Sequence, residues 1–141
     1  MNHQEIDIKL LDSWQKSDII NLYKSAGWWK NYYDSSKLND MIKGSFAFAV
    51  AVIKKSNKAI GMGRVISDGV SDAYIQDLVV LPEFQESGIG KQIVKTLLKQ
   101  CLSKKIVWIG LIAEPKQSGF YSNMGFNILQ DYTPMKYKQD D

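Results

Sequence analysis

Residues 6–10 alternate apolar and charged side chains, as a half-exposed β-strand does, and residues 45–53 are a continuous β-rich run with large side chains on one face and small ones on the other. The pattern predicts strands at residues 6–10, 45–53, 59–66 and 73–81. The last three are separated by the short turns Lys-Lys-Ser-Asn-Lys and Ser-Asp-Gly, and an Asp-Gly pair is typical of a hairpin. These strands are therefore expected to form an antiparallel sheet, in which Gly61 and Gly63 leave room for close approach of a neighbouring element.

Further along, apolar residues recur at the three- and four-residue spacing of a helix. A strand is predicted at residues 106–112, and because a helix connects it to residues 73–81, the two strands are expected to be parallel. Alternating segments at 126–129 and 133–138 are expected to form a closing hairpin. The clearest helical face, at residues 89–102, consists of Ile89, Ile93, Val94, Leu97, Leu98, Cys101 and Leu102.

Three shorter helices are predicted, at residues 17–26, 36–43 and 117–124. Ser17 is expected to cap the first of them, and Gly27 to follow it as a C′ glycine. Together the elements predict a single α+β domain over residues 1–141, with a mixed, mostly antiparallel sheet of about six or seven strands and about four helices.

Composition narrows the functional classes. The hydrophobic fraction of 45% and the charged fraction of 23% are ordinary for a soluble globular protein. The chain has 18 Lys and Arg residues against 15 Asp and Glu, a net charge of +3, and the basic residues are scattered. No nucleic-acid partner is expected from such a distribution. Without a signal peptide or an apolar run of about 18 residues, no contact with a membrane is expected either.

The chain has one cysteine, Cys101, and one histidine, His3. A single cysteine excludes an intrachain disulfide and fits a reducing cytoplasm. It lies on the apolar side of its predicted helix, which favours a buried structural thiol over a nucleophile. A Ser-His-Asp or Cys-His triad would need His3, and a Cys/His zinc site lacks ligands, so no metal is expected.

Four large aromatic residues follow the first predicted helix: Trp28, Trp29, Tyr32 and Tyr33. They can form a hydrophobic plug that seals the helix onto the sheet. Alternatively, part of the cluster forms the wall of a substrate pocket, because Tyr and Trp combine apolar area with a polar group.

Residues 85–91, Gln-Glu-Ser-Gly-Ile-Gly-Lys, connect a buried strand to the N-terminus of a helix. Unpaired N–H groups and the helix dipole at such a point favour an anion, and a phosphate or pyrophosphate fits. A nucleotide-triphosphate loop is excluded, since its glycines stand farther apart and Gln92 occupies its Ser/Thr position. A dinucleotide-binding loop is excluded because Ile93 stands where it needs a third glycine.

The loop does meet the pattern Q/R-x-x-G-x-G/A. The strand before it reads L-x-V-x-P (Leu78, Val80, Pro82), and residues 120–126 read F-Y-x-x-x-G-F. In these motifs and in the order of its predicted elements, nearly the whole chain resembles the GNAT superfamily of N-acetyltransferases, which bind acetyl-CoA. The resemblance implies a three-layer α/β/α fold whose fourth and fifth strands are parallel and splayed apart.

The resemblance also implies how acetyl-CoA would bind. The pantetheine arm would lie between the splayed strands, where an N–H group of the fourth strand would polarise the thioester carbonyl. The loop's N–H groups would hold the pyrophosphate. The cofactor-binding residues expected from this likeness are Val79, Val80, Gln85, Glu86, Ser87, Gly88, Ile89, Gly90, Lys91 and Phe120.

By its place in F-Y-x-x-x-G-F, Tyr121 matches the family's general acid, which protonates the leaving thiolate; the plainer interpretation is a core tyrosine. Asp77, on the central strand, has three candidate roles: general base, structural acceptor, or direct ligand of a cationic substrate. Glu114 follows the fifth predicted strand, where the family often contacts its substrate. The expected substrate-binding residues are Trp28, Trp29, Tyr32 and Asp77.

The expected function is that of a cytoplasmic enzyme. It would transfer the acetyl group of acetyl-CoA directly to a primary amine of a small molecule or peptide. The alternative is a non-catalytic domain of the same fold that binds acyl-CoA as a sensor or interaction module. A homodimer is compatible with the exposed strand edges that the pattern predicts.

Overall fold

A computed structural model describes residues 4–139, so His3 and the acidic pair Asp140 and Asp141 lie outside the described residues. The chain divides into two compact units, Met1–Gly110 and Leu111–Asp141, which are described separately.

The described residues form one five-stranded sheet with the order β1-β2-β3-β4-β5. The β1–β2, β2–β3 and β3–β4 pairs are antiparallel, and β5 runs parallel to β4, as the crossover connection predicts. This confirms the mixed, mostly antiparallel sheet. The strands are β1 (Ile6–Leu10), β2 (Ala47–Ile53), β3 (Lys58–Ser67), β4 (Asp72–Val80) and β5 (Trp108–Leu111).

The sheet has fewer strands than predicted because residues 126–129 and 133–138 form no strand in the described structure. Ile128 is 77% exposed and Tyr137 is 83% exposed, so neither segment buries an apolar face. Alternation specifies which side chains would share a face, whereas a strand also needs a paired neighbour. Pro134, which lacks an N–H group, further weakens the second segment as a strand.

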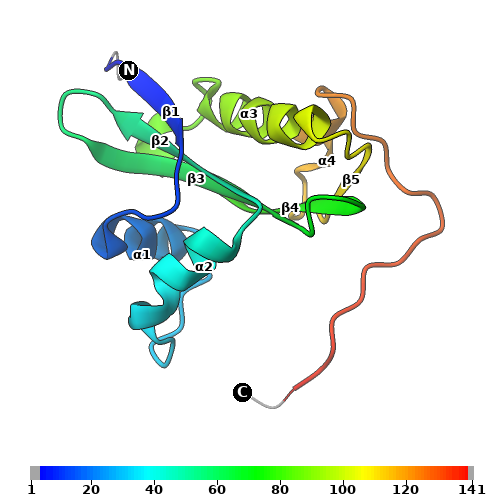
Figure 1. The fold of residues 1–141 in the computed structure, drawn as a ribbon, viewed down its shortest axis with the longest axis horizontal. Helices are drawn as coiled ribbons and strands as arrows, with labels where there is room; N and C mark the ends of the chain where they lie inside the picture. The colour runs from blue at the N-terminus through cyan, green and yellow to red at the C-terminus, as the bar shows by residue number, and fades with distance from the viewer. Residues whose placement is uncertain (1–3, 140–141) are drawn as a thin grey trace. The chain divides into compact units, whose positions relative to one another are not determined.

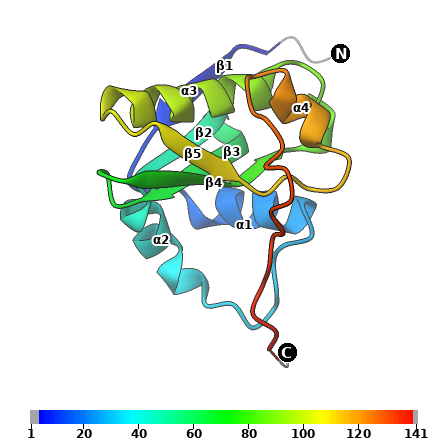
Figure 2. The same cartoon turned by 90° about the vertical axis from the view of Figure 1, so that its right-hand side faces the viewer.

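Residues 4–139 contain four α-helices, in agreement with the prediction of about four. In the first unit α1 (Lys16–Ser25) and α2 (Leu38–Gly44) cover one face of the sheet and α3 (Ile89–Ser103) covers the other, which gives the three-layer arrangement (Figures 1 and 2). A short 3-10 turn, η1 (Ser35–Lys37), leads into α2. The fourth helix, α4 (Ser118–Ser122), belongs to the second unit.

The predicted cap at Ser17 is wrong, since α1 begins at Lys16 and its N-cap position, Gln15, makes no side-chain capping bond. Asp18 instead connects the start of the helix to its surroundings. One of its carboxylate oxygens accepts hydrogen bonds from the indole N–H of Trp14 at 2.9 Å and from the backbone N–H of Ala59 at 3.1 Å. The first turn of α1 is thereby joined to the start of β3.

The close approach predicted at Gly61 and Gly63 is present, and α3 is the element that approaches. A Cβ atom at Gly63 would lie 3.0 Å from Ile93 Cγ2 and 3.2 Å from Leu97 Cδ1. At Gly61 it would lie 3.2 Å from Ile93 Cδ1. These glycines therefore let the helix that follows the 85–91 loop pack directly on β3.

Gly63→Ala is expected to lower the free energy of unfolding by about 1–3 kcal/mol, because the added methyl group overpacks the contact with α3. Urea denaturation measures the change. Gly44→Ala is the matched control, since Gly44 has open space around its Cβ position, and this helical substitution is expected to be neutral or slightly stabilising. Equal effects of the two substitutions would contradict the packing argument.

Candidate active site

The 85–91 loop is held by its own hydrogen bonds. The Gln85 side-chain amide donates to the Val80 carbonyl at 2.8 Å, and the Ser87 hydroxyl donates to the Phe84 carbonyl. Glu86 (φ 61°) and Gly88 (φ 86°) adopt left-handed backbone conformations. The Gln85 side chain therefore fixes the loop to the end of β4.

The N-terminus of α3 presents backbone donors at this loop. The Gln92 N–H donates to the Gly88 carbonyl, and the N–H groups before it in the first turn have no carbonyl partner within the helix. At its N-cap position, Gly88, no side-chain capping bond forms. A Cβ at Gly88 would meet no atom of the described residues within 4 Å. The loop thus has the open space and the backbone donors that an anion would need, at the positive end of a 15-residue helix.

Immediately before the loop, β4 carries the two predicted pantetheine contacts. Val80 pairs with Gly61 and Val79 pairs with Met62, after which the register shifts so that Gln76 pairs with Arg64. Asp77 and Leu78 therefore lie opposite Gly63 alone, in a β-bulge.

Asp77 has φ 59°, the left-handed conformation that a G1-type bulge requires at its first position. For a non-glycine residue this conformation costs about 1–2 kcal/mol, although Asp and Asn tolerate it better than most side chains. Strained backbone of this kind is found mainly at functional sites, which draws attention to the Asp77 side chain.

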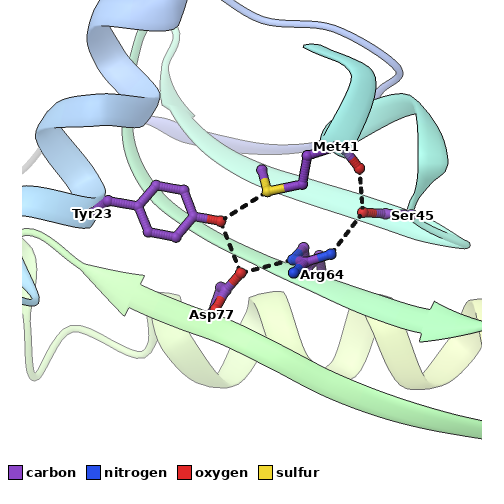
Figure 3. A network of polar contacts seen from close by, with 5 residues as sticks. All are labelled: Tyr23, Met41, Ser45, Arg64 and Asp77. Carbon is purple, nitrogen blue, oxygen red and sulfur yellow. Dashed lines mark hydrogen bonds and ion pairs between the residues drawn. The ribbon is translucent and has the colours of Figure 1, made fainter. Parts of the chain in front are cut away.

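A polar network surrounds Asp77 (Figure 3). Its Oδ2 accepts a hydrogen bond from the Tyr23 hydroxyl at 2.8 Å and from Arg64 Nε at 2.7 Å. Tyr23 also lies 3.3 Å from the Met41 sulfur, but a hydroxyl has one proton, and the carboxylate is the stronger acceptor. The Arg64–Asp77 ion pair is largely shielded, with side chains 17% and 22% exposed.

The network extends to α2. Arg64 Nη1 lies 3.5 Å from the Ser45 hydroxyl, which donates to the Met41 carbonyl at 2.8 Å. The network thus joins α1, β3, β4 and the end of α2, and Tyr23 and Arg64 meet at the Asp77 carboxylate. Sequence reasoning missed Tyr23, Arg64 and Ser45. The signal for Arg64 was available, because it is the chain's single arginine and it lies within an apolar strand.

Burial raises the pKa of Tyr23, and the negative charge of Asp77 raises it further. Tyr23 therefore remains a neutral hydrogen-bond donor well into the alkaline range.

This shift predicts how stability changes with pH. An exposed tyrosine has a pKa of about 10, and the folded chain keeps the Tyr23 proton above that pH whereas the unfolded chain loses it. The contribution of Tyr23 is therefore complete below pH 10 and is lost as the pH rises further. Tyr23→Phe is expected to flatten the alkaline fall in the free energy of unfolding by up to about 1.4 kcal/mol per pH unit. Urea denaturation at several alkaline pH values tests this, and parallel curves would contradict it.

A cavity of about 500 Å³ opens beside this network. It contains the predicted substrate-binding residues Trp28, Trp29 and Asp77, whereas Tyr32 does not line it. Tyr32 is 68% exposed and packs edge-on against Tyr33, with ring centroids 5.2 Å apart. The lining residues are Tyr23, Trp28, Trp29, Tyr33, Asp34, Lys37, Leu38, Met41, Arg64 and Asp77.

The end of α1 places the aromatic wall. The Trp28 N–H donates to the Tyr23 carbonyl at 2.9 Å and the Gly27 N–H donates to Lys24, a Schellman motif with Gly27 at φ 78°. The expected C′ glycine is therefore confirmed. The motif turns Trp28 back towards Tyr23, and their ring centroids are 6.4 Å apart.

In the second unit, α4 ends in a Schellman motif of the same kind, which involves Tyr121. The Phe126 N–H donates to the Tyr121 carbonyl and the Gly125 N–H donates to Ser122, with Gly125 at φ 96°. Tyr121 thereby packs against Phe126 on one side and Phe120 on the other, with ring centroids 5.8 and 5.0 Å apart. Burial raises the pKa of Tyr121, and the charge of Glu114 raises it further, so Tyr121 is a protonated phenol at neutral pH.

Cys101 is fully buried on α3, as its place on the apolar helical face predicts. Burial also raises the pKa of its thiol, which makes the reactive thiolate rarer. Cys101 is therefore a packing residue.

The sequence was compared with protein-family models and with known proteins. Residues 12–136 match the family model described as "Acetyltransferase (GNAT) domain". The chain is 35% identical to the uncharacterized N-acetyltransferase ycf52 of Pyropia yezoensis, over 76% of this chain and 65% of that protein. It is 33% identical to the chloroplastic GCN5-related N-acetyltransferase 1 of Arabidopsis thaliana, over 66% of this chain and 47% of that protein.

Solved structures share the fold. A GNAT family acetyltransferase from Streptococcus pneumoniae TIGR4 superposes with a TM-score of 0.79 and 31% identity, covering 97% of this chain and all of that one. Within residues 4–139, no helix has the length and apolar character needed to cross a membrane.

Proposed function

The chain belongs to the GNAT family of acetyltransferases, and we propose that it transfers the acetyl group of acetyl-CoA directly to a primary amine. One observation carries the proposal. Strand β4 runs from Asp77, on an aromatic cavity, through Val79 and Val80 to an open anion site at the N-terminus of α3. This arrangement supports a donor site and an acceptor site along one strand.

The donor site suits the phosphate end of coenzyme A. The N–H groups of residues 86–91 would hold its pyrophosphate, and Gly88 and Gly90 would let phosphate oxygens reach the backbone. Val79 and Val80 would pair with the pantetheine arm, and an N–H group of β4 would polarise the thioester carbonyl. Phe120 would contact the cofactor, as the family resemblance implies.

The acceptor site suits an amine on an apolar body. Tyr23, Trp28, Trp29 and Tyr33 supply aromatic faces that attract an ammonium group, and Leu38 and Met41 add apolar wall. In the reaction the ammonium releases a proton to water, and the amine nitrogen then attacks the thioester carbon. The tetrahedral intermediate loses the second nitrogen proton to water and collapses with cleavage of the C–S bond. The departing thiolate takes a proton from Tyr121, whose phenolate is then reprotonated from solvent.

Asp77 fits the role of an acceptor-binding group better than that of a general base. Two donors already occupy Oδ2, one of them the positively charged Arg64. With Oδ2 engaged by these two donors, the carboxylate is suited to accept an N–H group of the acceptor through its other oxygen.

The compartment stays a prediction. The buried Cys101 suits a reducing cytoplasm, whereas the Arabidopsis relative is described as chloroplastic.

An amine screen tests the proposal. Purified protein is incubated with acetyl-CoA and a panel of primary amines, and thiol release is followed. Turnover with at least one amine is expected. Calorimetric binding of acetyl-CoA without turnover on any amine would instead favour the non-catalytic module.

A further inference from the structure

The structure assigns the Asp77 carboxylate a fixed orientation rather than a free one. Resting on the proposed function, we propose that Tyr23 and Arg64 are positioning residues. They hold Oδ2 so that the other oxygen, Oδ1, accepts an N–H from the amine of the acceptor bound in the cavity. This role concerns the binding and orientation of the acceptor.

The hydrogen bonds support this division between the two oxygens. Both donors reach Oδ2, one from α1 and one from β3. Among residues 4–139 no buried side-chain oxygen or nitrogen lacks a partner, so Oδ1, which none of these bonds reaches, is an accessible atom. Asp77 lines the cavity, and in the proposed arrangement Oδ1 is the atom offered to a ligand there.

The backbone restricts the same group. The left-handed conformation in the bulge fixes where the Asp77 Cβ points, and the two donors then select among the broad set of χ2 angles that a carboxylate otherwise samples. Because the backbone and Oδ2 of Asp77 are already held, little side-chain entropy is lost when Oδ1 binds the ligand.

The charged residues of the cavity indicate that a bound ammonium group is recognised by a directed hydrogen bond rather than by a net negative charge. Asp77 pairs with Arg64, and the cavity lining also includes Asp34 and Lys37, so two acids are balanced by two bases. An ammonium group is therefore recognised by a directed hydrogen bond to Oδ1 and by the aromatic faces, rather than by net negative charge. The neutral amine that forms when the ammonium group loses a proton still has an N–H group to donate to Oδ1. The lone pair of its nitrogen then points away from Oδ1.

A binding experiment that needs no turnover tests the positioning role. The probes are benzylamine, charged at neutral pH, and benzyl alcohol, an uncharged molecule of similar shape. Both are titrated while tryptophan fluorescence is followed, because Trp28 and Trp29 line the cavity. The wild-type chain is expected to prefer benzylamine by about tenfold or more, as a charge-assisted hydrogen bond implies.

The variants separate orientation from charge. Asp77→Asn is expected to abolish the preference, and Tyr23→Phe to reduce it about threefold without changing net charge. Arg64→Met leaves Asp77 uncompensated, so an effect of charge alone would raise the preference above wild type and overturn the proposal. Positioning predicts no gain. Tyr33→Phe, which removes another cavity hydroxyl that does not contact Asp77, should change both probes alike.

A double-mutant cycle completes the test. If Tyr23 acts through Asp77, Tyr23→Phe has no further effect on the preference in an Asp77→Asn background. Additive effects would overturn the assignment. Urea midpoints show that each variant is folded under the assay conditions. Since these readouts do not use acetyl-CoA, a failed amine screen would count against the proposed function and leave this test intact.

Discussion

Tyr121→Phe is expected to lower turnover by about 100-fold or more, while acetyl-CoA affinity changes little, because the phenol would protonate the leaving thiolate. Its raised pKa keeps the hydroxyl protonated at neutral pH, as a general acid requires. Phenylalanine preserves the ring contacts with Phe120 and Phe126. The loss should therefore appear in kcat, measured by thiol release with the best amine from the screen.

Tyr132→Phe is the matched control, since Tyr132 lies in the same unit and is 77% exposed. It is expected to retain wild-type turnover. If Tyr121→Phe and wild type turned over equally, the general-acid assignment would be wrong and Tyr121 would be a packing residue of its helix end.

Gly88→Ala is expected to weaken acetyl-CoA binding by about tenfold or more, because a Cβ would stand in the space that the phosphate needs and strain the left-handed backbone. The effect is measured by isothermal titration calorimetry. Gly69→Ala isolates the strain, since Gly69 has a similar φ of 82° in the turn between β3 and β4. Both variants should lose stability, and only Gly88→Ala should lose affinity. Comparable affinities would mean that the loop does not hold the pyrophosphate.

Features encoded by neighbouring residues could be predicted from the sequence. Short polar turns predicted the antiparallel pairing of β2, β3 and β4, and helical spacing predicted α3 to within a residue at each end. The glycine spacing within residues 85–91 predicted a glycine loop at the start of a helix, and Gly88 is the N-cap residue of α3. That the loop holds an anion stays a prediction.

The features that were missed depend on distant residues. Tyr23 and Asp77 are 54 positions apart, and no local pattern joins them. The bulge did leave a trace, because Gln76 and Asp77 are consecutive polar residues inside a strand and interrupt its alternation. The predicted N-cap at Ser17 was wrong because Asp18, the next residue, makes the long-range contacts at the start of α1.

The bulge at Asp77 has a consequence for natural variation at this site. A left-handed backbone admits glycine, asparagine and aspartate readily and most other residues at a cost, whatever chemistry the side chain offers. Glutamate carries the same charge as aspartate, but the left-handed backbone at position 77 disfavours it regardless of its longer side chain. Where related proteins keep the bulge, position 77 should therefore vary among Asp, Asn and Gly, so that selection at this site chooses between a carboxylate, an amide and no side chain at all.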